Sequence, residues 1–143
     1  MKVLIDTNVF LSYILAPERR SVVTEVVTAC LGDDEVDLLV PPEQLAELVD
    51  KVANKRYFRT RIPQAMIKNL VAQLEGLSNL QPLETIAAYS RDPKDDYLVA
   101  YGVVNDADYL ITGDKDLLVL NRVRTLQIVT PSQFHKLLPA QES

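Results

Sequence analysis

The first ten residues, MKVLIDTNVF (residues 1–10), place an acidic side chain at the point where a buried strand ends. The first five residues are mostly apolar, which is typical of a strand that is covered on both faces. This run stops at Asp6, Thr7 and Asn8, and the apolar stretch 9–15 has the length of a short helix, with Asn8 as its expected cap. We therefore expect Asp6 to lie at the carboxyl end of the first strand, at the edge of the core.

The rest of the chain alternates between short apolar strands and longer amphipathic helices. Further strands are expected at residues 37–40, 107–112 and 126–129, with an extended stretch at 79–85. The expected helices are 21–31, 43–55, 63–77, 92–104 with Asp92 as cap, a turn at 117–120, and a terminal helix from residue 130. Alternating strands and helices predict one α/β domain over residues 1–143, a three-layer α/β/α sandwich with a mostly parallel central sheet.

Composition narrows the class of protein further. The chain has 143 residues, of which 48% are apolar and 24% charged, as in an ordinary globular domain. The single cysteine, Cys30, excludes an internal disulfide and fits a reducing compartment. No apolar run approaches the roughly 20 residues that a membrane span needs, so we expect a cytoplasmic protein.

Positive charge is concentrated in one segment, although the net charge is −5. This segment, residues 51–68, has no acidic residue and is called the basic strip below; it holds Lys51, Lys55, Arg56, Arg59, Arg61 and Lys68. Such a strip can bind a phosphate backbone, and Tyr57 and Phe58 inside it can stack on unpaired bases. The alternative is a solvated helix end and loop.

Four acidic residues are expected at the same edge of the sheet. Asp6 and Asp114 follow the carboxyl ends of strands, which meet at one edge when the strands are parallel. Glu47 and Asp95 lie in the first turns of helices that begin on that side. Distant parts of the sequence therefore converge on one crevice.

Each acid also has an ordinary structural explanation. Asp6 and Asp114 can cap helices, as can Asp116. Glu47 can pair with Lys51 four residues later, and Asp95 can simply favour the dipole of its helix. The coincidence of all of them at one edge favours a site over these separate explanations.

Clustered carboxylates repel one another unless a cation lies among them, and Mg²⁺ or Mn²⁺ prefers such oxygen ligands. His135 and Cys30, the only residues of their kinds, are expected to serve packing or to lie at the surface, so a zinc site is not predicted. The sequence also has no glycine-rich phosphate loop. The chemistry that fits is attack of a metal-activated water on a phosphate.

Four segments of the chain, in this order, resemble the acidic segments of PIN-domain nucleases. They are LIDTNVFLS (4–12), VPPEQLAELV (40–49), RDPKDDYLVA (91–100) and ADYLITGDKDLL (107–118). The resemblance covers essentially the whole chain and is greatest to stand-alone PIN proteins assigned as toxins of toxin–antitoxin modules, the VapC-like group. It differs at Pro41, where relatives often have serine, and in the two acids of the GDKD turn.

The resemblance implies a set of site residues. The catalytic acids would be Asp6, Glu47, Asp95 and Asp114, and the metal ligands would be Asp6, Asp95, Asp114 and the auxiliary Asp116. The supporting residues would be Thr7, Asn8, Asp96 and Thr112. The basic strip supplies the expected RNA-binding residues, which are Lys51, Lys55, Arg56, Arg59 and Arg61. Asp95 is preferred to Asp96 because it shares a helical face with Leu98 and Val99. Either Asp114 or Asp116 can be the direct ligand.

The same resemblance implies a Mg²⁺- or Mn²⁺-dependent endoribonuclease, the toxin of a two-protein module with a cognate antitoxin and a homodimeric state. Three alternatives remain. One is a structure-specific DNA or flap nuclease, although the chain is short for gripping a duplex. Another is a catalytically silent PIN-like module that binds RNA or protein. The third is a phosphatase or phospho-acceptor with Asp6 as nucleophile, although Thr7 and Asn8 supply neither the second acid nor the lysine that it needs.

Overall fold

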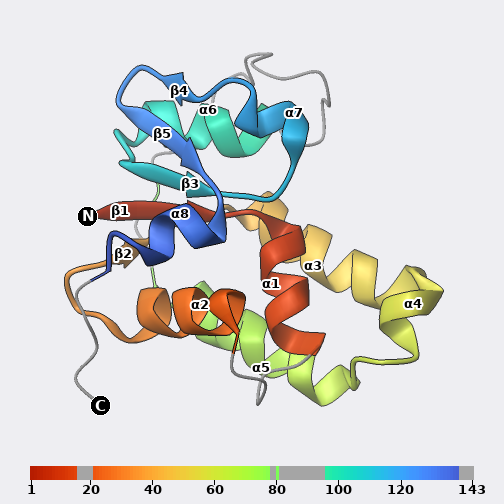
Figure 1. Cartoon of the computed structure of the whole chain (residues 1–143). Helices are drawn as coiled ribbons and strands as arrows, with labels where there is room; N and C mark the ends of the chain where they lie inside the picture. The colour runs from red at the N-terminus through yellow and green to blue at the C-terminus, as the bar shows by residue number, and fades with distance from the viewer. Residues whose placement is uncertain (16–20, 78–79, 81–95, 139–143) are drawn as a thin grey trace.

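The computed structural model describes residues 1–15, 21–77, 80 and 96–138, and within them the chain forms a five-stranded, mostly parallel sheet (Figure 1). The strand order is β2-β1-β3-β5-β4, and only β4 runs antiparallel to its neighbour. The strands are β1 (Lys2–Ile5), β2 (Asp37–Leu38), β3 (Tyr109–Ile111), β4 (Arg122–Val123) and β5 (Leu126–Val129).

Helices cover both faces of this sheet. They are α1 (Thr7–Leu15), α2 (Val22–Gly32), α3 (Pro42–Asn54), α4 (Arg56–Arg59), α5 (Gln64–Glu75), α6 (Asp96–Val104), α7 (Lys115–Leu118) and α8 (Pro131–His135). Figure 1 shows α6 on one side of the sheet and α2, α5 and α8 on the other. The predicted three-layer α/β/α sandwich is confirmed.

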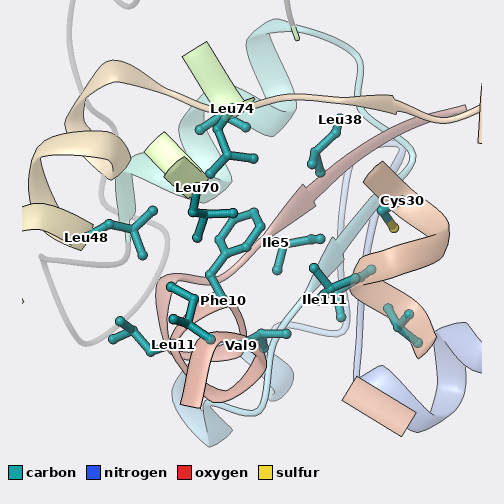
Figure 2. Close-up of a cluster of buried hydrophobic side chains, with 14 of the residues drawn as sticks. Ile5, Val9, Phe10, Leu11, Cys30, Leu38, Leu48, Leu70, Leu74 and Ile111 are labelled. Atoms are coloured by element: carbon teal, nitrogen blue, oxygen red, sulfur yellow. The ribbon is translucent and has the colours of Figure 1, made fainter. Parts of the chain in front are cut away.

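The alternation of side chains along the strands creates two cores. Ile5 and Ile111 contribute to the larger core, which they form with residues of α1, α2, α3 and α5 (Figure 2). Leu4 and Leu110 point to the opposite face and pack against α6 and β5. Because successive strand residues face opposite sides, a strand segment buried on both faces must be apolar throughout, as Val3, Leu4 and Ile5 of β1 are.

The helix α6 lies very close to the sheet. A Cβ atom added at Gly102 would stand 2.8 Å from Leu126 Cδ2 and 3.1 Å from Leu4 Cδ1. An added methyl group would force these leucine side chains to shift, so Gly102 allows the last turn of α6 to pack closely on the sheet. None of the helices in the described part of the chain has the length and apolar character that crossing a membrane requires.

Several boundaries differ from those predicted. Asn8 is not the cap of the first helix, because that helix begins at Thr7, two residues earlier than expected, and the Asp6 carbonyl accepts from Val9 N at 3.0 Å. The helix α4 and the strand β4 were not predicted, since four and two residues are too few to show a periodicity. The expected extended stretch at 79–85 and the expected helix start at Asp92 lie outside the described residues.

Candidate functional site

Asp6 lies at the junction of β1, β3 and α1. Its carboxylate is 3% exposed, accepts a hydrogen bond from Thr112 Oγ1 at 2.7 Å, and accepts another from the backbone N–H of Asn8. Burial raises the pKa of Asp6, and the negative charge of Asp114 raises it further, while the Thr112 and Asn8 hydrogen bonds and the charge of Lys51 act in the opposite direction. The carboxylate therefore combines the role of a helix cap with that of a buried acid whose charge is incompletely compensated.

Thr112 connects Asp6 to the second predicted acid. Its fully buried hydroxyl donates to Asp6 and accepts from the backbone N–H of Asp114 at 3.0 Å. Asp114 Oδ1 accepts from Asp116 N at 2.9 Å, so Asp114 also caps α7. Asp6, Asn8 and Asp114 line an open cavity of about 360 Å³, whose other lining residues are Val9, Ser12, Val23, Gly113 and Pro131.

The helix α3 brings two more predicted residues to this region, one turn apart. Glu47 Oε1 accepts from Tyr97 Oη at 3.3 Å, and Lys51 Nζ donates to Asn8 Oδ1 at 3.3 Å. Lys51 therefore contacts the first segment of the site, whereas the alternative explanation was an ion pair with Glu47. Burial raises the pKa of Tyr97, and the charges of Glu47 and Asp6 raise it further, so both carboxylates act on the same phenol.

Two residues of this region were not predicted from the sequence. Gln44 is fully buried, and its Nε2 donates to the Ile5 carbonyl and, at 3.4 Å, to Thr7 Oγ1. Its Oε1 has no hydrogen-bond partner among the described residues. The sequence feature that could have indicated Gln44 is its position three residues before Glu47, on the same helical face. For Tyr97 the only such feature is a polar hydroxyl in an otherwise apolar helix.

The remaining predicted acids are placed only in part. Asp95 lies outside the described residues, and Asp96 is described only as the first backbone position of α6. Asp116 contributes its backbone N–H to Asp114 but does not line the cavity. Within the residues that the structure describes, no group of three or more His, Cys, Asp or Glu side chains is arranged to hold a metal ion.

The donors that are described fit a hard divalent cation. The carboxylates of Asp6 and Asp114 and the amide oxygen of Asn8 line one cavity, and such oxygen ligands suit Mg²⁺ or Mn²⁺. A positive ion between the two carboxylates would compensate the charge that burial leaves unfavourable at Asp6. The chemistry available to such a cavity is metal-assisted hydrolysis.

The basic strip begins beside this cavity and extends away from it along α3 and α4. Lys55, Arg56 and Arg59 are exposed, whereas Arg61 bonds locally through Nη1 to the Tyr57 carbonyl at 3.0 Å. The Arg61 guanidinium lies 4.0 Å from the centre of the Tyr57 ring, which is 55% exposed. Since Phe58 packs against the larger core, Tyr57 is the aromatic side chain left for stacking.

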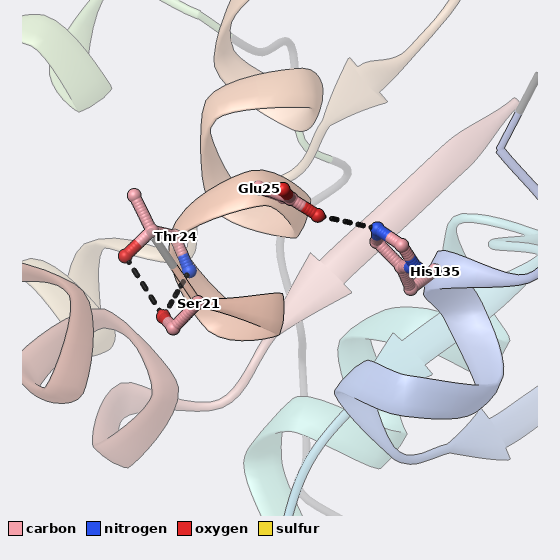
Figure 3. A network of polar contacts seen from close by, with 4 residues as sticks. All are labelled: Ser21, Thr24, Glu25 and His135. Atoms are coloured by element: carbon pink, nitrogen blue, oxygen red, sulfur yellow. Dashed lines mark hydrogen bonds and ion pairs between the residues drawn. The ribbon is translucent and has the colours of Figure 1, made fainter. Parts of the chain in front are cut away.

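Cys30 and His135 take no part in this site. Cys30 is buried in the larger core, as predicted, and burial raises its pKa to about 12. His135 Nε2 lies 2.6 Å from Glu25 Oε2, a contact that joins α8 to α2 next to the Ser21 cap (Figure 3). The histidine is half-exposed and serves the packing of two helices.

The family described as PIN domain matches residues 2–116, a range that begins in β1, ends in α7 and contains every predicted acid. No curated protein and no solved structure matches the chain. PIN domains are generally metal-dependent nucleases, which are hydrolases that typically use divalent ions. The match covers most of the chain and agrees with the sandwich fold and the acids at its sheet edge. This chain belongs to the PIN-domain family.

Proposed function

We propose that this protein is a Mg²⁺- or Mn²⁺-dependent endoribonuclease that hydrolyses RNA phosphodiester bonds. The observation that carries the proposal is the bridge made by the Thr112 hydroxyl, which ties the buried Asp6 carboxylate to the Asp114 backbone at the mouth of one cavity. Buried acids whose pKa values are perturbed, gathered in a cleft, are typical of active sites.

In this mechanism Asp6 and Asp114 would hold the ion together with Asp95, and Asp116 would assist. When bound, the ion would lower the pKa of the attacking water and polarise the phosphate. Glu47, half-buried on α3, would accept the proton of the attacking water, and its negative charge would add to the attraction of the ion. Two threonines keep the backbone around Asp6 in place. Thr112 bonds to the Asp6 carboxylate, and Thr7 bonds to the side-chain amide of Gln44.

RNA binding is assigned to the basic strip. Lys51 stands at the edge of the cavity through its contact with Asn8, and the exposed Lys55, Arg56 and Arg59 continue the positive surface away from it. Binding of phosphates along this positive surface would direct the RNA strand toward the acidic residues of the cavity, and Tyr57 would stack on an unpaired base. Arg61 supports the ring of Tyr57 in that role.

The role as the toxin of a toxin–antitoxin pair rests on the resemblance of the four acidic segments to such toxins. An apolar groove of about 480 Å³ between α3 and α5 would offer a binding surface to a protein partner, either an antitoxin or a second copy of the chain. It is lined by Leu45, Val49 and Val71 among others, and Val49 is half-exposed. Reducing surroundings suit the single buried thiol, in agreement with a cytoplasmic location.

The test compares single-stranded RNA, single-stranded DNA and a DNA flap as substrates, each with Mn²⁺ and with a chelator. We expect RNA cleavage that the chelator stops and Mn²⁺ restores, and that Asp6→Asn abolishes. Asp34→Asn makes the same chemical change at an exposed turn and should leave activity unchanged. Cleavage of the flap alone would favour a structure-specific DNA nuclease, and RNA binding without cleavage a silent module.

A further inference from the structure

Two tyrosine–glutamate pairs connect α6 to α3. Tyr97 Oη lies 3.3 Å from Glu47 Oε1, and Tyr101 Oη lies 2.8 Å from both carboxylate oxygens of Glu43. The tyrosines are four residues apart on α6, and the glutamates are four residues apart on α3 in the opposite order. The two pairs are therefore chemically matched and stand one helical turn from each other.

Only the inner pair is connected to the candidate site. Tyr97 donates to Glu47, and the charges of both Asp6 and Glu47 act on that phenol and raise its pKa. Around Tyr101, by contrast, Glu43 is the only charged group of the described residues that perturbs the phenol, whose pKa is raised to about 12 mainly by burial. Glu43 itself is exposed.

The direction of the hydrogen bonds in this region is fixed by the groups that make them. Gln44 Nε2 can only donate, and it donates to the Ile5 carbonyl and to Thr7 Oγ1. An ionised carboxylate can only accept, so the Tyr97 hydroxyl is the donor to Glu47 Oε1 at 3.3 Å.

We propose that Tyr97 is a positioning residue that holds the Glu47 carboxylate in its catalytic orientation relative to Asp6. This inference rests on the proposed function, in which Glu47 accepts the proton of the attacking water. A glutamate side chain on a helix has several rotamers, and Glu47 is only half-buried, so packing alone does not select one. The phenol engages Oε1 of Glu47 and leaves Oε2 for the reaction, and Tyr97 is itself held in place because it is 7% exposed and packed in the core around α6.

The test compares Tyr97→Phe with Tyr101→Phe, two substitutions that remove one hydroxyl each from matched pairs. Groups that orient the reacting residues of a metal site are commonly worth 10- to 100-fold in activity or metal affinity. We expect Tyr97→Phe to lower kcat for RNA cleavage about 10-fold or more, with KM changed less than about twofold, and to weaken Mn²⁺ binding measured by calorimetry without RNA. Tyr101→Phe should leave kcat, KM and Mn²⁺ affinity as in the wild type.

A second comparison tests whether Tyr97 acts through Glu47. In a Glu47→Gln background, adding Tyr97→Phe should not lower kcat further, because the group it orients is already absent. Equal effects of the two phenylalanine variants, or additive effects in the double variant, would overturn the inference. If Tyr97→Phe does not fold, Tyr97→Met, which also lacks the hydroxyl, must give the same loss of kcat.

Failure of the proposed function gives a different result. If the wild type cleaves no RNA, the nuclease proposal fails, but the Mn²⁺ titrations still compare the two pairs. A weaker Mn²⁺ affinity in Tyr97→Phe alone would then support the positioning of Glu47. Identical affinities in the wild type and both variants would overturn it.

Discussion

Replacing Thr112 with valine tests how the candidate site is held together. The substitution keeps the shape of the side chain and removes a hydroxyl that makes two buried hydrogen bonds. The bond to Asp6 Oδ2 at 2.7 Å has an ionised acceptor and is worth about 1.5–3 kcal/mol, and the bond from Asp114 N at 3.0 Å is worth about 0.5–1.5 kcal/mol. We therefore expect Thr112→Val to lower the free energy of unfolding by about 2–4 kcal/mol at neutral pH.

Thr112→Ser is the matched control. Serine keeps both hydrogen bonds and lacks one buried methyl group, which costs about 1 kcal/mol. Urea unfolding followed by far-ultraviolet circular dichroism, in chelator, measures both variants against the wild type. In an Asp6→Asn background the cost of Thr112→Val should fall, since the acceptor is then neutral. A valine variant that is no less stable than the serine variant would refute the role assigned to the Thr112 hydroxyl.

Three further predictions concern charge and packing. The pKa of Asp6 is raised above its ordinary 3.8, so the folded state loses stability as the pH rises above 3.8. Asp6→Asn should therefore be more stable than the wild type at pH 7 in chelator, and should have no such advantage at pH 3. Gly102→Ala should destabilise by about 1–2 kcal/mol, since the Leu126 contact outweighs the helix propensity gained, whereas Gly76→Ala has open space and should be neutral or stabilising. Charge reversal of Arg56 and Arg59 should weaken RNA binding and lower its salt slope by about 1 for each phosphate that the variant no longer binds.

Each of these has a contrary outcome. A wild type that equals or exceeds Asp6→Asn in stability at pH 7 would show that the Thr112 and Asn8 hydrogen bonds outweigh burial. A harmless Gly102→Ala would show that Leu126 yields without cost. RNA binding with an unchanged salt slope would assign the basic strip to a solvated surface. Reversal of Arg122 on β4 and of Lys136, the residue after α8, which both lie outside the basic strip, gives the reference for unspecific charge effects.

The strands and the larger helices were predictable because burial on two faces leaves a clear apolar pattern. Val3, Leu4 and Ile5 are fully buried and show it well, and the polar interruption at Asp6 marked the strand end by the same logic. Helices with a proline or a capping hydroxyl at the start were also placed closely, as at Ser21 and Thr130. These features depend on neighbours in sequence.

Contacts between distant elements were not predictable in the same way. Asp6 rather than Asn8 caps α1, because hydrogen bonds to Ile111 of β3 and to the following Thr112 hold Asp6 in place. The links from Gln44 to Thr7 and from Tyr97 to Glu47 depend on how α3 and α6 pack around the end of β1. Periodicity gives the face of a helix but not the partner that this face meets.

The central claim is that Asp6 and Asp114 hold a divalent ion in the cavity that they line. Anomalous diffraction from crystals soaked in Mn²⁺ tests it directly. We predict a peak about 2 Å from carboxylate oxygens of both residues, which is absent in crystals of Asp6→Asn. A Mn²⁺ peak elsewhere, or none in crystals of a protein that cleaves RNA with Mn²⁺ in solution, would contradict the account.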